Sequence, residues 1–173
     1  MFEEKPTKLI ILRGPSGSGK STIAKLLFEK AERKICLVEQ DYYRFIFKPA
    51  GGGSKANGAT THKMIKNDVL IALKDGYDVI LEGILSVKSY EEVLESIFTE
   101  HSYENYIFYF DVSFEETVRR HSTRTLKAPK FGEIEMKEWY PDAHKSDHRL
   151  EKIIPETFSI EDAMSFIKKI AGI

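Results

Sequence analysis

The strongest constraint on this chain is a glycine-rich segment near its start. Residues 14–21 are GPSGSGKS and match the pattern G-x-x-x-x-G-K-[ST] at every fixed position. An apolar run at residues 9–12 precedes the segment, and an amphipathic stretch carrying Ile23, Leu26 and Leu27 follows it. The motif requires this order of strand, loop and helix. Glycines let backbone N–H groups converge on phosphate oxygens, and the next helix points its positive end at them.

The segment therefore predicts a nucleotide triphosphate site, with ATP and Mg²⁺ as its cofactors. Lys20 is expected to bridge the β- and γ-phosphates, and the Ser21 hydroxyl to ligate Mg²⁺. The alternative without function is a glycine turn that precedes a helix by chance. The predicted nucleotide-binding residues are Gly14, Pro15, Ser16, Gly17, Ser18, Gly19, Lys20, Ser21 and Thr22.

The rest of the chain alternates short apolar runs with helical patterns. Further runs occur at residues 35–38, 79–81 and 107–110, with a weaker one at 153–154. Runs that are apolar on both faces are typical of parallel strands covered by helices on both sides. Three serine–acid pairs fit the capping box of a helix start, namely Ser89 with Glu92, Ser113 with Glu116, and Ser159 with Asp162. These patterns predict an α/β fold with a doubly wound sheet.

Size and composition predict one soluble domain spanning residues 1–173. The net charge of −1 gives no general attraction to nucleic acid or to anionic membranes. Cys36 is the only cysteine, which favours a reducing, cytoplasmic location without disulfides. No apolar segment is long enough to predict a signal peptide or a membrane span, and the oligomeric state is not predicted.

Several classes of nucleotide-binding protein fit this chain poorly. It has no N-K-x-D motif for reading guanine and no L-S-G-G-Q-like segment, and it is short for a hexameric ATPase module. A small kinase needs only a base for the acceptor, an acid that supports the metal, and a basic lid in addition to the phosphate loop.

The stretch VEQDYYR at residues 38–44 supplies a candidate base. Asp41 follows the second apolar run, at the carboxyl edge where open α/β sheets bind ligands. A carboxylate there can accept the proton of an attacking hydroxyl. Arg44 would share its helix face and hold the acceptor or orient the carboxylate. The alternative is an N-capping aspartate with a solvated arginine partner.

Glu82 ends the third apolar run and is the candidate metal-supporting acid, or else a polar strand end before Gly83. Downstream, Arg120, Arg124 and Lys127 share one helix face and could neutralise charge that develops during transfer. A solvated basic helix end is the alternative. The charged segment from about residue 120 to 149 is expected to form a mobile helical lid.

Together, GPSGSGKST, QDYYR, DVILEG and FDVSFEETVRRHSTR resemble the small P-loop kinases of the zeta-toxin-like and polynucleotide-kinase-like group. The resemblance implies a five-stranded parallel sheet in the order 2-3-1-4-5. It also implies that Asp41 is the general base with Arg44 beside it, and that Arg120 and Arg124 are lid arginines. Family members have an aspartate at the position of Glu82, so this residue departs from the pattern. Adenine contacts are implied for the lid helix and for residues 155–158.

Three functions remain open from the sequence. The favoured one is transfer of the γ-phosphate of ATP to a hydroxyl of a small molecule. A 5′-hydroxyl polynucleotide kinase is the second, and the near-neutral charge argues weakly against it. The third is a nucleotide-dependent switch or binding module that has no acceptor.

Overall fold

Five parallel strands form a single sheet in the order β2-β3-β1-β4-β5. The computed structural model describes residues 6–47, 58–100, 104–123, 132–140 and 151–173. Each apolar run of the sequence lies inside one strand, and the predicted fold and strand order are confirmed. The strands are β1 (Lys8–Arg13), β2 (Ile35–Glu39), β3 (Asp78–Gly83), β4 (Glu104–Asp111) and β5 (Glu151–Pro155).

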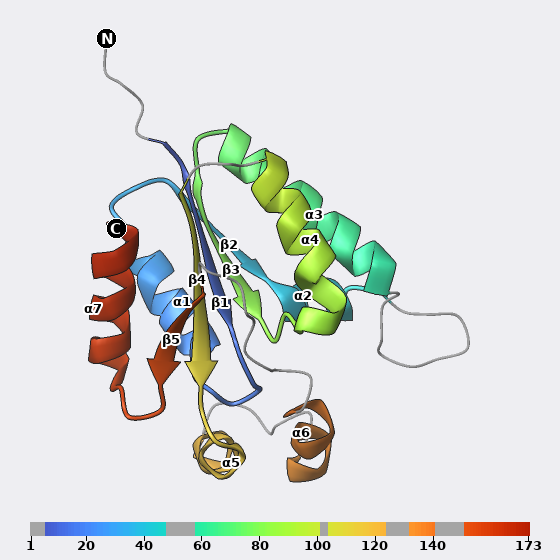
Figure 1. Cartoon of the computed structure of the whole chain (residues 1–173), viewed down its shortest axis with the longest axis vertical. Coiled ribbons are helices and arrows are strands. Elements are labelled where there is room, and N and C mark those ends of the chain that lie inside the picture. The colour runs from blue at the N-terminus through green and yellow to red at the C-terminus, as the bar shows by residue number, and fades with distance from the viewer. Residues whose placement is uncertain (1–5, 48–57, 101–103, 124–131, 141–150) are drawn as a thin grey trace.

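Helices cover both faces of this sheet (Figure 1). One layer holds α1 and α7, and the opposite layer holds α3 and α4, while α5 and α6 lie beyond the carboxyl end of β4. The short α2 follows β2 directly and contacts α3. The helices are α1 (Lys20–Glu29), α2 (Gln40–Phe45), α3 (Gly58–Lys74), α4 (Val87–Glu100), α5 (Phe114–Ser122), α6 (Glu133–Trp139) and α7 (Ile160–Ala171).

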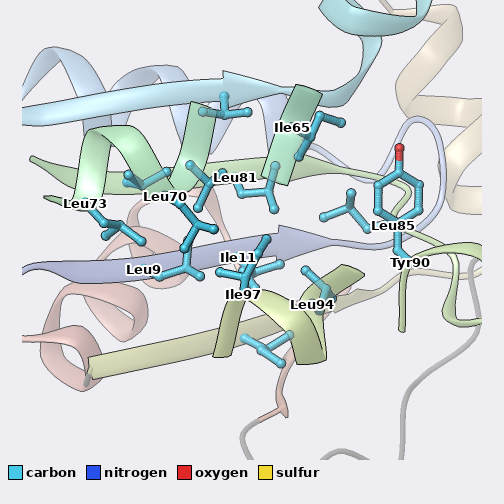
Figure 2. Packing of buried hydrophobic residues seen from close by; sticks show 14 of the residues in the cluster. Leu9, Ile11, Ile65, Leu70, Leu73, Leu81, Leu85, Tyr90, Leu94 and Ile97 are labelled. Atoms are coloured by element: carbon cyan, nitrogen blue, oxygen red, sulfur yellow. The ribbon is translucent and has the colours of Figure 1, made fainter. Parts of the chain in front are cut away.

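A separate hydrophobic cluster fills each of the two layers. On the α3–α4 side, Leu9, Ile11 and Leu81 of the sheet pack against Ile65 and Ile97 of the helices (Figure 2). The α1–α7 side uses the alternate strand residues, such as Ile10, Leu12 and Phe108. Each fully buried aliphatic side chain contributes about 1.5–3 kcal/mol. The continuous apolar runs in the sequence reflect this burial on both faces.

The register brings several polar residues to one edge of the sheet. Glu39 of β2 lies opposite Glu82 of β3, and Arg13 of β1 lies opposite Gly83. All strands run in the same direction, so their carboxyl ends share this edge with the glycine-rich loop. The candidate site must therefore be built here.

Only one of the three predicted capping boxes forms. Ser159 accepts a hydrogen bond from the Asp162 N–H, and the Asp162 carboxylate accepts from the Ser159 N–H. Ser113 is the N-cap of α5, but its N–H and its hydroxyl both donate to the Glu156 carboxylate, and the Glu116 carboxylate pairs with two arginines instead. The prediction for Ser89 was wrong, since α4 begins two residues earlier at Val87.

Among the described residues, no helix combines the length and apolar character that crossing a membrane requires.

Candidate functional site

The glycine-rich loop joins β1 to α1 in a conformation that side chains would disrupt. Gly14, Gly17 and Gly19 have φ values of +143°, +83° and +100°, a region that favours glycine. A Cβ on Gly14 would lie 2.9 Å from the Phe110 carbonyl oxygen, and one on Gly17 would lie 2.7 Å from that of Thr117. Gly14 and Gly17 are thus required both by their dihedral angles and by close backbone contacts with β4 and α5, and Gly19 by its dihedral angles alone.

Two polar side chains of the loop are buried, and one of them has an unsatisfied hydroxyl. Lys20 is 6% exposed, and its Nζ donates to the Pro15 carbonyl oxygen at 2.8 Å. The Ser18 hydroxyl is buried and has no hydrogen-bond partner within the described residues. Burying a hydroxyl in this way is costly unless a ligand completes it. A cationic group and an unsatisfied hydroxyl beside a glycine loop fit a phosphate chain.

Ser21 and Glu82 bring a hydroxyl and a carboxylate together at the start of α1. The Ser21 hydroxyl lies 3.1 Å from both carboxylate oxygens of Glu82, which is 5% exposed at the end of β3. Burial raises the pKa of the Glu82 carboxyl, as do the charges of Asp41 and Glu39, whereas Lys20 and the Ser21 hydrogen bond lower it. Hard oxygen donors in this position fit Mg²⁺, and a glutamate supplies them as an aspartate would.

A pocket of about 410 Å³ opens beside the loop, between α1, α5 and the β5–α7 connection. Its apolar wall includes Ile154, Pro155 and Phe158, so part of the 155–158 segment faces it. Gly17, Ser18, Gly19 and Thr22 line the opposite side. Contiguity with the phosphate loop makes this the candidate site for the nucleoside half of ATP.

Arg120 forms hydrogen bonds with three separate segments beside this pocket. Its guanidinium donates to the Ser18 carbonyl oxygen at 2.9 Å, to the Glu156 carbonyl oxygen at 2.9 Å, and to the Glu116 carboxylate at 2.6 Å. Arg120 thus links α5 both to the phosphate loop and to the segment after β5, and it lines the nucleoside pocket. The other two cations of the predicted basic face, Arg124 and Lys127, lie outside the described residues.

Asp41 lies in the first turn of α2, after the N-cap residue Glu39. The capping alternative for Asp41 therefore does not hold. Its side chain is 68% exposed, and Arg44 Nη1 lies 3.4 Å from its Oδ1. The Asp41 charge acts on two neighbours, Glu82 beside the phosphate loop and Tyr90 on α4. The Asp41 carboxylate is therefore near enough to both groups to raise the pKa of each.

A second pocket of about 230 Å³ is lined by Gln40, which precedes Asp41 in α2, and by Arg44, its ion-pair partner; Asp41 itself is not among the lining residues. Arg44 is the only lining residue that the sequence predicted as part of the site, because the others are dispersed over α2, α3, α4, α6 and the β3–α4 turn. The described lining residues are Gln40, Arg44, Gly58, Thr61, His62, Ile84, Ser86, Ser89, Tyr90 and Trp139. We call this cavity the acceptor pocket.

Aromatic rings and uncharged polar groups dominate the acceptor pocket. The rings of His62 and Tyr90 meet edge to face with centroids 4.2 Å apart. Burial lowers the pKa of His62, which keeps the imidazole neutral at pH 7. Burial also raises the pKa of the Tyr90 phenol, so this group stays protonated. Arg44 supplies the one charge among the described lining residues.

A buried chain of hydrogen bonds connects this pocket with the strand before the phosphate loop. Leu85 has a φ of +44° in the β3–α4 turn, a strained value for a residue with a side chain. Its N–H donates to Gln40 Oε1 at 3.3 Å, and its carbonyl oxygen accepts from Arg13 Nε at 3.2 Å. Arg13 also pairs with Glu151 at 2.7 Å, with both side chains 2% exposed. No local sequence pattern indicates this pair, whose members lie 138 positions apart.

The predicted lid of residues 120–149 is described only at residues 120–123 and 132–140. Within it, α6 packs close to the phosphate loop, since Met136 is 2% exposed and its methyl lies 3.1 Å from the Cβ position of Gly17. The Tyr140 hydroxyl donates to the Val112 carbonyl oxygen at 2.9 Å. The middle of α6 thus borders the phosphate loop through Met136, and Trp139 at its carboxyl end borders the acceptor pocket.

A family of AAA domains matches residues 9–140, which is most of the chain and includes the phosphate loop, Asp41 and Glu82. The chain belongs to this family. No curated protein matches it.

Many solved structures share this fold. A chain of the Pnkp1/Rnl/Hen1 RNA repair complex is 26% identical with a TM-score of 0.62, over 79% of this chain and 44% of that one. This chain thus spans less than half of that relative. A sugar kinase from Janibacter sp. HTCC2649 is 15% identical with a TM-score of 0.71, covering 97% and 96% of the two chains. The APS kinase CysC of Mycobacterium tuberculosis, in complex with AMPPNP and APS, is 16% identical with a TM-score of 0.68, covering 97% and 99%.

This member of the AAA domain family therefore has a P-loop kinase fold. The similar structures include a sugar kinase, an APS kinase and a chain of an RNA repair complex. This range of neighbours does not identify one acceptor, so the chemistry of this chain must be argued from its own residues.

Proposed function

We propose that this chain is an ATP-dependent phosphotransferase that moves the γ-phosphate to a hydroxyl of a small molecule. The observation that carries the proposal is the position of Asp41. Its charge acts both on Glu82, which contacts Ser21 of the phosphate loop, and on Tyr90 in the wall of the acceptor pocket. A carboxylate between a nucleotide site and a second pocket is where a general base is needed.

Each step of transfer then has a residue assigned to it. The loop N–H groups and Lys20 bind the phosphates, and the nucleoside occupies the pocket bordered by Arg120 and Phe158. Ser21 and Glu82 would hold Mg²⁺, which neutralises phosphate charge when bound. Asp41 takes the proton of the acceptor hydroxyl while the hydroxyl oxygen of the acceptor bonds to the γ-phosphorus. The bond to the β–γ bridging oxygen breaks, and ADP leaves with the electron pair.

Arg44 and Arg120 have supporting roles in this mechanism. The Arg44 guanidinium, 3.4 Å from Asp41, orients the carboxylate and contacts the acceptor. Arg120 holds the phosphate loop through the Ser18 carbonyl and packs along the nucleoside pocket. Arg124, four positions further along the sequence and outside the described residues, is proposed to stabilise the transferring phosphate.

A second candidate is a 5′-hydroxyl polynucleotide kinase, favoured by the 26% identity to a chain of an RNA repair complex. A polynucleotide needs several cations along its backbone. Only Arg44 supplies a charge among the described residues of the acceptor pocket.

The test is transfer of label from γ-labelled ATP to separate pools of monosaccharides, nucleosides, antibiotics and 5′-hydroxyl oligonucleotides, with and without Mg²⁺. The proposal expects Mg²⁺-dependent label on one small-molecule pool. Label only on oligonucleotides would establish the second candidate instead. ATP hydrolysis that no pool stimulates, at a rate unchanged in Asp41→Asn, would identify a nucleotide-dependent switch.

A further inference from the structure

One polar atom in the acceptor pocket is left unsatisfied by the fold. Thr61 lies in the first turn of α3 and is 2% exposed. Its hydroxyl has no hydrogen-bond partner within the described residues, and the residue lines the pocket. A buried hydroxyl without a partner costs about 1–3 kcal/mol. A ligand that supplies the missing hydrogen bond accounts for a threonine at this position.

The groups around Thr61 define what such a ligand looks like. Ser86 and Ser89 also line the pocket, as does Gln40, whose Oε1 already accepts from the Leu85 N–H. His62, Tyr90 and Trp139 add flat aromatic surface. Hydroxyl and amide groups complement the hydroxyls of a polyol, and aromatic faces pack against the apolar face of its ring.

Size and charge narrow the class further. The cavity of about 230 Å³ is smaller than the roughly 300–1,000 Å³ of pockets for drug-sized ligands. No carboxylate lines it among the described residues, so a polycationic acceptor would meet Arg44 without a compensating partner. Among the described residues, the Arg44 guanidinium makes one long ion pair, with Asp41, and lies over the Phe45 ring, so it can take one anionic substituent.

We propose that Thr61 determines acceptor specificity by hydrogen-bonding an acceptor hydroxyl, and that the acceptor is a polyol of monosaccharide size with at most one anionic group. This inference rests on the proposed kinase function and narrows its substrate class. It also assigns a role to a buried residue that no motif contains.

Thr61→Val keeps the shape of the side chain and removes the hydroxyl, and Thr61→Ser is the matched control that keeps it. The expected result for Thr61→Val is an acceptor KM raised about 10-fold, with kcat and the KM for ATP within about twofold of wild type. Its free energy of unfolding should be unchanged or higher, because an unsatisfied polar group has been removed. Thr61→Ser should restore most of the acceptor KM. A purely structural role predicts the reverse, a less stable Thr61→Val protein with an unchanged acceptor KM.

The acceptor class is tested with neutral monosaccharides, sugar acids and sugar monophosphates against nucleosides, aminocyclitol antibiotics and 5′-hydroxyl oligonucleotides. Label on the monosaccharide-sized compounds is expected, and the neutral and anionic arms distinguish whether Arg44 binds an anion. Preference for any of the other three groups would overturn the inference and leave the kinase proposal standing.

Calorimetric binding of the same compounds, measured without transfer, separates the two proposals. If monosaccharide-sized compounds bind wild type more tightly than Thr61→Val but receive no phosphate, the kinase function is wrong and the pocket assignment holds. If none of them binds wild type, the pocket assignment is wrong whatever the transfer assay shows.

Discussion

The nucleotide side and the acceptor side of this site are built in different ways. The phosphate loop comes from one continuous segment, in which Gly14 and Gly17 are fixed by contacts with the Phe110 and Thr117 carbonyls. The acceptor pocket takes residues from α2, α3, α4, α6 and the β3–α4 turn. A phosphate chain is the same in every ATP, so one backbone arrangement serves all such enzymes. An acceptor differs from enzyme to enzyme, and dispersed side chains can be exchanged singly without disturbing the loop.

Because the two sides are held by different contacts, most substitutions should affect only one of them. The exception is Arg13 on the strand before the phosphate loop, which pairs with Glu151 of β5 and donates to the Leu85 carbonyl oxygen in the β3–α4 turn. Glu151→Gln leaves the Arg13 charge buried without its anion. We expect the free energy of unfolding in urea to fall by about 3–5 kcal/mol.

The matched control for that variant is Glu100→Gln, which breaks the exposed pair of Lys66 and Glu100. An exposed pair contributes less than about 1 kcal/mol. If both variants lose the same small amount of stability, the Arg13 pair does not hold the two sides together.

Lys20→Met should damage the nucleotide side alone. Loss of one preorganised cation at the phosphates is expected to lower the transfer rate by about 10²–10³-fold for every acceptor. Lys25→Met, on the exposed face of the same helix, is the control and should transfer at the wild-type rate. The affinity of either variant for the acceptor, measured by calorimetry, should not change. A changed acceptor affinity in Lys20→Met would show that the two sides are not independent.

Arg120 and Arg119 offer a closer comparison, since both pair with Glu116. Arg120 alone of the two also donates to the Ser18 and Glu156 carbonyls and lines the nucleoside pocket. Arg120→Ala is expected to weaken ATP binding about 10-fold, as for loss of about 1.4 kcal/mol. Arg119→Ala should bind ATP as wild type does in the same fluorescence titration. Equal loss in both would mean that their shared ion pair matters and the loop contact does not.

The smallest expected effect is a pH dependence at Glu82. Because the pKa of this carboxyl is raised in the folded protein, the folded state binds a proton more tightly than the unfolded chain. Its contribution to stability should therefore fall as the pH rises from about 4.5 through the raised value. Urea unfolding of ligand-free protein between pH 5 and 7 should show the stability of wild type declining relative to Glu82→Gln. If the stability of wild type instead rises relative to that of Glu82→Gln as the pH increases, the assignment of a raised pKa to Glu82 is wrong.

The fold could be predicted from the sequence because its signals are local. Apolar runs such as residues 9–12 mark strands buried on both faces, and the glycine-rich loop fixes the first strand-to-helix junction. Asp41 could be placed at the carboxyl edge because it directly follows β2. The capping box predicted at Ser113 does not form, because Ser113 donates to the distant Glu156 while Arg119 and Arg120 pair with Glu116.

The acceptor pocket could not be predicted in the same way. Thr61 and Tyr90 look like ordinary helix residues, and nothing in their local patterns indicates that α3 and α4 place them in one cavity. The sequence around Leu85 does not predict its left-handed backbone conformation, in which the N–H and the carbonyl oxygen of Leu85 bond to the distant Gln40 and Arg13. Residues that meet only through tertiary packing carry no signal in a single sequence.

The central claim is that the two sides meet at Asp41. Its most direct test is to measure ATP affinity and phosphoryl transfer on one preparation of Asp41→Asn. The side chain is 68% exposed, so the substitution should leave the fold and the ATP dissociation constant unchanged, while transfer falls by about 10²–10⁴-fold. Transfer at the wild-type rate, or a loss of activity fully explained by weaker ATP binding, would contradict the claim.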